Sequence, residues 1–193
     1  MTWLICDYGE VLCLPQPTAD KAAIVAAAAI AAAAGDFWKA YWRHRPAYDR
    51  ADISAAEYWE SVLGAAPSSP QLLDLVAADT ASWLHPNMES IAAIDGLSER
   101  GIGLALLSNA PLEVAAGIDA APWLESFAER FFSCHMKAVK PEPRAYEAVL
   151  DALGVAAGDV VFVDDRPANV HGARAVGMRA VLFDGPARLG TLF

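Results

Sequence analysis

Four short apolar segments, each followed directly by polar residues, constrain what this chain can fold into. Short apolar runs bounded by turn-forming residues are typical of buried strands. The carboxyl ends of parallel strands meet at one edge of an open α/β sheet, and ligands bind at that edge. We therefore expect a site built from the polar clusters that end these runs, which are Asp7, then Ser108 with Asn109, then Lys140 in Lys140-Pro141-Glu142-Pro143, and finally Asp164 with Asp165.

The segments on either side of residues 15–85 alternate between strand and helix patterns. Residues 102–107 and 160–163 are apolar throughout, which is typical of strands with both sheet faces covered. We expect further strands at 131–134 and 179–183, with helices between them. This alternation predicts an α/β fold with a Rossmann-like, doubly wound parallel sheet.

Residues 15–85 follow a different pattern, because they contain four helical segments and no convincing strand. A stretch of this kind between strands indicates an insertion into the α/β core. The sequence therefore predicts a core domain made of residues 1–14 and 86–193, with an all-helical domain of residues 15–85 inserted into it.

Local signals set the expected ends of the inserted helices. Thr18 is the expected N-cap of the first helix, which we expect to run through Ala34 and to stop at Gly35. Pro46 is expected to interrupt the aromatic helix that follows. Ser54 begins the third helix with a capping box, in which the glutamate three residues later bonds back to the serine.

The charge balance limits the partners that this chain can bind. Lys and Arg number 14 against 24 Asp and Glu, which gives a net charge of -10. Nucleic acids and anionic membrane surfaces need a basic face, so we expect neither as a partner. The longest apolar run, residues 22–34, is too short to span a bilayer. Any anionic substrate must meet a local positive centre, such as a metal ion or a lysine.

The three cysteines indicate a reducing compartment. Cys6, Cys13 and Cys134 cannot all pair with one another, and their spacing fits no metal site. The first residues show no basic segment before an apolar one, so we expect no signal peptide. The sequence therefore predicts a cytoplasmic protein with reduced core thiols.

The order of the clusters (acid, hydroxyl, lysine, paired acids) resembles the four motifs of the haloacid dehalogenase-like (HAD) hydrolases. The resemblance spans residues 7–177, and the first motif reads Asp-x-Gly-x-Val. That form is similar to the phosphatase branch that includes glucose-1-phosphate phosphatases and the N-terminal phosphatase domain of epoxide hydrolases. The resemblance implies a phosphatase that acts on a small phosphorylated metabolite, with the helical insertion as a cap that closes over the site and selects the substrate.

The resemblance also assigns roles to individual residues. Asp7 would attack phosphorus and form an aspartyl phosphate that water then hydrolyses. Ser108 through its hydroxyl and Asn109 through its backbone N–H would bind the phosphoryl oxygens. Lys140 would neutralise the charge on Asp7 and the phosphate, and its Lys-Pro-Glu-Pro setting favours it over nearby Lys137.

A carboxylate that faces a phosphate dianion needs positive charge between them, and Mg²⁺ bound by hard oxygen ligands supplies it. The expected ligands are the carboxylates of Asp7 and Asp165 and the backbone carbonyl of Gly9. Asp164 is expected either to support these ligands from behind or to act as an alternative metal ligand. Asn169 either holds the loop after Asp165 through side-chain hydrogen bonds or is an ordinary residue of a first helical turn.

Substrate contacts from the cap are expected to come from its basic and aromatic side chains. Arg45 is the leading candidate, with His44, Trp42, Tyr41 and Tyr48 beside it. Aromatic residues at helical spacing more often form the core of a helical domain. Both interpretations remain open for the aromatic residues.

The pattern departs from the family at Gly9, where phosphatases usually carry a second aspartate. That aspartate protonates the leaving oxygen, a contribution of about 10²–10⁴-fold. Glu10, or a water held by Asp165 or Lys140, is a candidate to replace it. Without a strong general acid, turnover is expected to depend steeply on the leaving group.

Two other functions remain open. The first is a 2-haloacid dehalogenase, in which the same aspartate attacks carbon without a metal. Those enzymes generally place glycine three positions after the nucleophile and lack the full aspartate pair, so the phosphatase is favoured. The second is a binding or regulatory protein that keeps the fold with weak or no turnover, and Gly9 is its only support.

Overall fold

The computed structural model describes residues 2–29 and 34–193. A five-stranded sheet in the order β3-β2-β1-β4-β5 forms its centre, and all neighbouring strands are parallel. This confirms the predicted α/β fold with a doubly wound parallel sheet. The strands are β1 (Trp3–Cys6), β2 (Gly103–Ser108), β3 (Glu129–Phe132), β4 (Val160–Asp164) and β5 (Arg179–Leu182).

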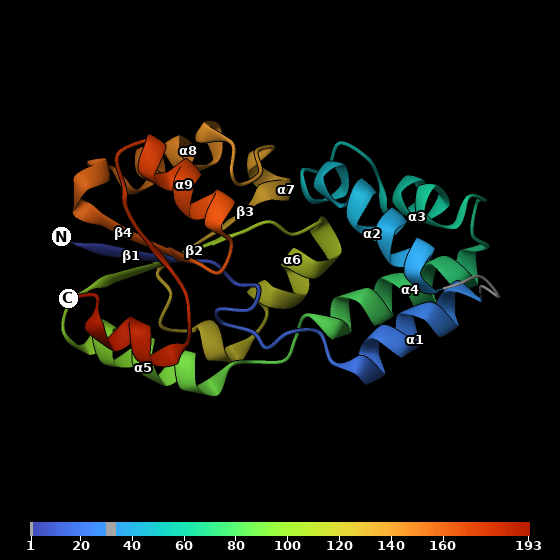
Figure 1. Ribbon diagram of the computed structural model, residues 1–193, viewed down its shortest axis with the longest axis horizontal. Coiled ribbons are helices and arrows are strands. Elements are labelled where there is room, and N and C mark those ends of the chain that lie inside the picture. The colour runs from blue at the N-terminus through green and yellow to red at the C-terminus, as the bar shows by residue number, and fades with distance from the viewer. Residues whose placement is uncertain (1, 30–33) are drawn as a thin grey trace.

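Helices cover both faces of the sheet (Figure 1). On one face lie α5 (Met88–Glu99), α6 (Leu112–Asp119) and the short helices η1 (Pro122–Leu124) and η3 (Pro186–Thr191). On the other lie α8 (Pro143–Leu153) and α9 (Pro167–Ala175), with α7 (Ser133–Met136) and η2 (Ala157–Asp159) in the connections.

Successive side chains of each strand point alternately into these two layers, because the strand is pleated. In β1, Leu4 and Cys6 pack into the layer of α5 and α6, while Ile5 packs into the layer of α8 and α9. All six residues of β2 and all five of β4 are buried. Because both faces of these two strands are covered, their residues before the final Ser108 and Asp164 are glycine or apolar, which is why the sequence shows them as unbroken runs.

The strand register places the polar clusters at one edge. Cys6 pairs with Leu106 of β2 and with Val163 of β4. Asp7 continues the ladder, since its N–H donates to the carbonyl of Val163 at 2.9 Å. The carboxyl ends of β1, β2 and β4 therefore emerge side by side.

Four helices between β1 and β2 form what we call the cap: α1 (Thr18–Ala28), α2 (Ala34–Asp49), α3 (Ala55–Leu63) and α4 (Ser69–Ser82). They lie beyond the carboxyl ends of the strands (Figure 1). Their shared interior is aromatic, with the rings of Tyr48 and Tyr58 stacked at 4.4 Å. The segments that lead into and out of the cap run side by side, because Cys13 and Pro86 form an antiparallel bridge. The boundaries at residues 15 and 85 stay a prediction.

Two predicted helix ends in the cap are wrong. The first helix stops at Ala28, where Ala29 takes a left-handed conformation (φ 49°), and Gly35 lies inside α2. An alanine-rich run carries no side-chain signal for its end, and part of the predicted helix, residues 30–33, lies outside the described residues. Thr18 is the first residue of α1 and not its cap, since the N-cap is Pro17 and makes no side-chain bond.

The interruption predicted at Pro46 is also wrong, because α2 continues through it to Asp49. Proline removes one helical hydrogen bond. Tyr41 and Tyr48, which flank Pro46 on the same helix, are both buried in the aromatic interior of the cap. This packing holds the helix together on either side. Tertiary contacts thus override the local preference.

Other local predictions compare as follows. The capping box at Ser54 is confirmed, with the Ser54 N–H donating to Glu57 at 2.7 Å. The strand predicted over residues 131–134 ends at Phe132, and α7 begins at Ser133. Cys6, Cys13 and Cys134 are free and buried. Among the described residues, no helix has the length and apolar character needed to cross a membrane.

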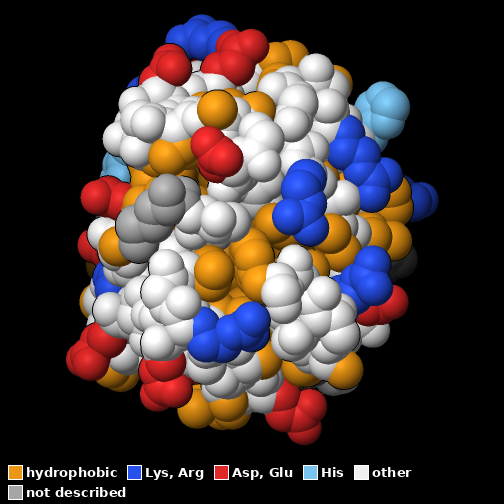
Figure 2. Space-filling model, turned by 90° about the vertical axis from the view of Figure 1, so that its left-hand side faces the viewer, with side chains coloured by type: hydrophobic (Ala, Val, Ile, Leu, Met, Phe, Trp, Pro, Cys, Tyr) orange, Lys and Arg blue, Asp and Glu red, His pale blue; other side chains and the backbone are white. Residues whose placement is uncertain are grey.

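The end of the molecule away from the cap carries both chain termini (Figure 1). Acidic and basic side chains are both present there, with small groups of apolar side chains between them (Figure 2).

Gly172 allows α9 to pack tightly against the loop that carries Lys140. A methyl group at Gly172 would lie 2.7 Å from the carbonyl oxygen of Pro141. We predict that Gly172→Ala lowers the free energy of unfolding by about 1–3 kcal/mol through overpacking, as measured by urea denaturation.

Gly96→Ala is the matched control, because Gly96 also lies within a helix and a methyl group there meets open space. It should raise the stability by about 0.5–1 kcal/mol. Equal effects of the two substitutions would contradict the close approach of α9 to Pro141.

Candidate active site

A cavity of about 120 Å³ lies between the carboxyl edge of the sheet and the cap. Every phosphoryl-binding, catalytic or metal-binding residue predicted in the core lines it except Asp164, which lies behind the others. Side chains from the core and the cap both contribute to the wall. Its lining residues are Asp7, Tyr8, Gly9, Glu10, Trp42, Arg45, Asp49, Trp83, Ser108, Asn109, Ala110, Val114, Ile118, Lys140, Asp165, Arg166 and Asn169.

Lys140 is the buried cation at the centre of the site. Its Nζ lies 2.6 Å from Oδ1 of Asp7 and 2.8 Å from Oδ2 of Asp164. Burial alone would lower the pKa of Lys140, but the two carboxylates outweigh it and raise that pKa above its usual value. Lys137, the competing lysine of the sequence, is exposed and donates to the carbonyl of Ala51 at 2.7 Å. Lys140 is therefore the lysine of the site.

Asp164 is fully buried, and hydrogen bonds occupy both of its oxygens. Besides Lys140, it accepts from Nδ2 of Asn169 at 3.0 and 2.9 Å and from the N–H of Arg166 at 2.8 Å. Asn169 thus bonds to the aspartate pair itself, through Asp164. These contacts satisfy a charge that would be costly to bury alone.

Asn109 positions the lysine loop through its side chain. Its Nδ2 donates to the carbonyl of Lys140, and its Oδ1 accepts from the N–H of Lys140, each at 2.9 Å. Sequence reasoning considered only the backbone N–H of Asn109 and missed this role, because nothing in the local pattern links two residues 31 positions apart. The neighbouring Ser108 hydroxyl lines the cavity and has no hydrogen-bond partner in residues 2–29 and 34–193.

Three carboxylates are grouped near Lys140, and their negative charge exceeds the positive charge of the lysine, which favours the binding of a metal cation. Ligand atoms of Asp7, Asp164 and Asp165 all lie within 4.8 Å of one another. Burial and the charge of Asp164 raise the pKa of Asp7 to about 7, although Lys140 opposes the rise. Burial, followed by Asp164 and Glu10, also raises the pKa of Asp165. A hard oxygen donor set with excess negative charge fits Mg²⁺, and Asp7 and Asp165 are the members that line the cavity.

Trp83 of the cap segment covers Gly9, the position of the missing second aspartate. A methyl group at Gly9 would lie 3.7 Å from Cζ3 of Trp83. The hydroxyl of Tyr8 donates to the Trp83 carbonyl at 2.9 Å and ties the two segments together. A side chain at position 9 would therefore begin in ordinary van der Waals contact with the indole ring. No sequence pattern indicated that Trp83 belongs to the site.

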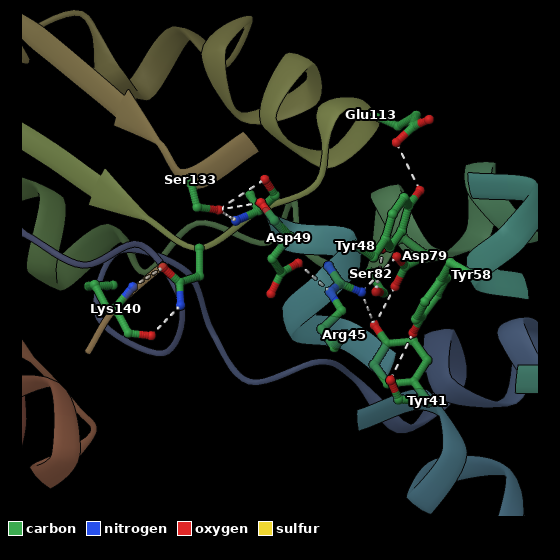
Figure 3. Close-up of polar contacts among 12 residues, drawn as sticks. Tyr41, Arg45, Tyr48, Asp49, Tyr58, Asp79, Ser82, Glu113, Ser133 and Lys140 are labelled. Carbon is green, nitrogen blue, oxygen red and sulfur yellow. Dashed lines mark hydrogen bonds and ion pairs between the residues drawn. The ribbon is translucent and has the colours of Figure 1, made fainter. Parts of the chain in front are cut away.

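The cap candidates divide into two groups. Arg45 and Trp42 line the cavity, whereas Tyr41 and Tyr48 belong to the aromatic interior of the cap, and His44 does not line the cavity. Figure 3 shows Arg45 among its partners. Its Nε donates to Asp49 at 2.7 Å, and its Nη1 donates to Asp79 at 2.9 Å and to the Tyr41 hydroxyl at 2.6 Å.

This fold and this set of motifs define a hydrolase class. A profile of the haloacid dehalogenase-like hydrolases matches residues 1–177. The chain belongs to this family.

Two curated relatives carry different names. The chain is 34% identical to a phosphatase of Mycobacterium tuberculosis over 113 residues, which cover 58% of this chain and 52% of that protein. It is 35% identical to haloacetate dehalogenase H-2 of Moraxella sp. (strain B) over 95 residues, which cover 49% of this chain and 42% of that protein. The matches therefore span about half or less of these relatives.

A solved structure shares the fold over nearly the whole chain. It is a HAD family enzyme of Bacteroides thetaiotaomicron in complex with magnesium and inorganic phosphate. The TM-score is 0.68 at 20% identity, and the match covers 94% of this chain and 93% of the other.

The buried ion pairs of Lys140 predict a large cost for its removal. Lys140→Met leaves the buried Asp164 without its cation, so we expect the free energy of unfolding in chelator to fall by about 3–5 kcal/mol. Lys137→Met, the control on an exposed side chain, should change it by about 0.5 kcal/mol or less. Urea denaturation measures both variants, and a similar small loss in each would rule out the central role of Lys140.

Proposed function

We propose that this protein is a Mg²⁺-dependent phosphatase that hydrolyses a small phosphorylated metabolite through an aspartyl phosphate on Asp7. The observation that carries the proposal is the grouping of three carboxylates around Lys140, next to the unpartnered Ser108 hydroxyl, in one cavity. The named phosphatase relative and the fold neighbour solved with magnesium and phosphate support it. The buried free cysteines support a reducing compartment such as the cytoplasm.

The two oxygens of Asp7 have different surroundings. Oδ1 lies 2.6 Å from Lys140 Nζ and accepts the N–H of Tyr8 at 2.6 Å. Oδ2 has no hydrogen-bond partner in the described part of the chain, so it is the oxygen free to attack phosphorus. Its attack forms the phosphorus–Oδ2 bond and breaks the bond to the leaving oxygen, which takes a proton from water. A second water then attacks phosphorus, releases phosphate and restores the Asp7 carboxylate.

The other residues hold the phosphoryl group. Ser108 Oγ and the backbone N–H of Asn109 donate to its oxygens, and Lys140 balances the charge that gathers beside Asp7. Mg²⁺ held by Asp7, Asp165 and the carbonyl of Gly9 would supply the positive charge that lets a carboxylate approach a phosphate dianion. Asp164 keeps Lys140 in place through its own ion pair.

Metal dependence and the nucleophile are tested together with 4-nitrophenyl phosphate. We expect release of nitrophenol with Mg²⁺, none with chelator, and none from Asp7→Asn under either condition. Asp151→Asn, which changes an exposed aspartate on α8, is the control and should match the wild type. Release that persists in Asp7→Asn would exclude the aspartyl phosphate.

A protein inactive under every condition would direct attention to the two other functions. Turnover of 2-chloropropionate would establish the dehalogenase. Binding of beryllofluoride at Asp7 without turnover of any substrate would indicate a competent site in a binding protein.

The glycine at position 9 predicts a steep dependence on the leaving group. No carboxyl group stands at that position to protonate the leaving oxygen, a contribution of about 10²–10⁴-fold. Across a series of aryl and alkyl phosphates, we expect kcat/KM to fall steeply as the pKa of the leaving alcohol rises, so that aryl, acyl and anomeric sugar phosphates react and simple alkyl phosphates barely do. A flat series would show that another group, such as Glu10, delivers the proton.

A further inference from the structure

Asp49 of the cap presents a carboxylate oxygen to the active-site cavity. The residue lines the cavity and is otherwise buried, with 7% of its surface exposed. Its Oδ1 accepts Arg45 Nε at 2.7 Å, while its Oδ2 has no hydrogen-bond partner within residues 2–29 and 34–193. In Figure 3 the second oxygen points away from Arg45, towards the side on which Lys140 lies. An acceptor therefore faces the substrate from the cap.

The charge behind this acceptor is negative. In the described part of the chain, Arg45 is the one cation that pairs with the two carboxylates of a buried cluster, Asp49 and Asp79. Asp79 is 2% exposed and does not line the cavity, so its charge stays behind the wall. Burial raises the pKa of Asp49, and the guanidinium of Arg45 limits that rise. Arg166, the other guanidinium on the lining, also opposes the rise in the pKa of Asp49, but it is exposed and sits over the Trp42 ring at 5.9 Å, where solvent screens its charge more than that of the buried Arg45.

The Asp49 backbone is held against the core, so the acceptor cannot easily turn away. Ser133 Oγ donates to the Asp49 carbonyl at 2.6 Å. The Tyr48 hydroxyl donates to Glu113 of α6 at 2.8 Å, and Arg50 forms an ion pair with Glu142. Three consecutive residues, the last two of α2 and the one that follows it, thus bond to the core. A side chain fixed in this way can discriminate between substrates, because its position does not relax to suit a poor one.

We propose that Asp49 is a specificity-determining residue that selects leaving groups with a hydrogen-bond donor, either hydroxyl or ammonium, and rejects those with a second negative charge. This inference rests on the proposed phosphatase function. A donor on the leaving group satisfies Oδ2, whereas a carboxylate or second phosphate meets a like charge at a wall with little water. The apolar side chains of Trp42, Trp83, Val114 and Ile118 complete the space around the leaving group.

Four phenyl phosphates with different para substituents test the selection. The substituents are methyl, hydroxymethyl, aminomethyl (as ammonium) and carboxymethyl (as carboxylate), each polar group being joined to the ring through a carbon that insulates it, so that the acidity of the phenols and the chemical step change little along the series. For the wild type we expect kcat/KM with hydroxymethyl and ammonium to exceed that with methyl, and kcat/KM with carboxylate to fall about 10-fold or more below it.

Two isosteric variants separate the role of Asp49 from the stability of the cluster. Asp49→Asn keeps the bond to Arg45 but removes the charge that faces the cavity, so the ratio of carboxylate to methyl kcat/KM should rise about 10-fold. Asp79→Asn removes an equal charge from the other partner of Arg45, but that charge lies behind the wall, so this variant should raise the ratio clearly less than Asp49→Asn does. The ratios compare the same substrates in every variant, so a general loss of activity cancels.

The outcomes distinguish this inference from the function beneath it. Hydrolysis of all four phosphates at similar rates by the wild type would overturn the role of Asp49 and leave the phosphatase intact. An equal change in both variants would assign the selection to the net charge of the cluster and overturn the assignment to Asp49. No hydrolysis of any of the four, or of 4-nitrophenyl phosphate, would remove the phosphatase function and this inference with it.

Discussion

The ion pairs of Lys140 with Asp7 and Asp164 are the interaction on which the site depends. Three parallel strands bring their carboxyl ends together, and carboxylates crowded at that edge would otherwise repel one another in a poorly hydrated space. One buried ammonium, bonded to two of them, makes the arrangement tolerable. The side chain of Asn109 fixes the loop that carries Lys140 by two hydrogen bonds to the Lys140 backbone. The close packing of Gly172 against Pro141 supports the same loop. Much of the neighbouring structure therefore positions one side chain.

The core and the cap contribute different kinds of residue to the cavity around Lys140. In the proposed mechanism the core supplies the charged groups that meet a phosphoryl group, and its remaining negative charge favours a metal ion. The cap supplies the wall that meets the rest of the substrate, through Trp42, Arg45, Asp49 and Trp83. Trp83 also lies next to Gly9, within van der Waals contact of a methyl group placed there. Chemistry at the core and selection by the cap thus share one small cavity.

Local patterns predicted the parts of this protein that depend on neighbouring residues. Unbroken apolar runs revealed β2 and β4 because both faces of those strands are covered, and the first polar residue after each run marked the edge of the sheet. The capping box at Ser54 was readable for the same reason, since its partners are three residues apart. Prediction was wrong where local signals were weak or overridden, as at Gly35 in an alanine-rich stretch and at Pro46 in a helix held by aromatic packing.

The sequence by itself determined the α/β sheet, the helical insertion and the core residues Asp7, Ser108, Lys140 and the aspartate pair, because periodicity and turn chemistry are local properties of a chain. Only the tertiary structure decided which oxygen of Asp7 is free, that Asn109 holds Lys140, that Trp83 lies over Gly9, and that Asp49 faces the cavity while Asp79 does not. These relations join residues 30 or more positions apart or depend on which side of a helix packs inward. No local pattern encodes them, since packing sets them once the helices and the sheet come together.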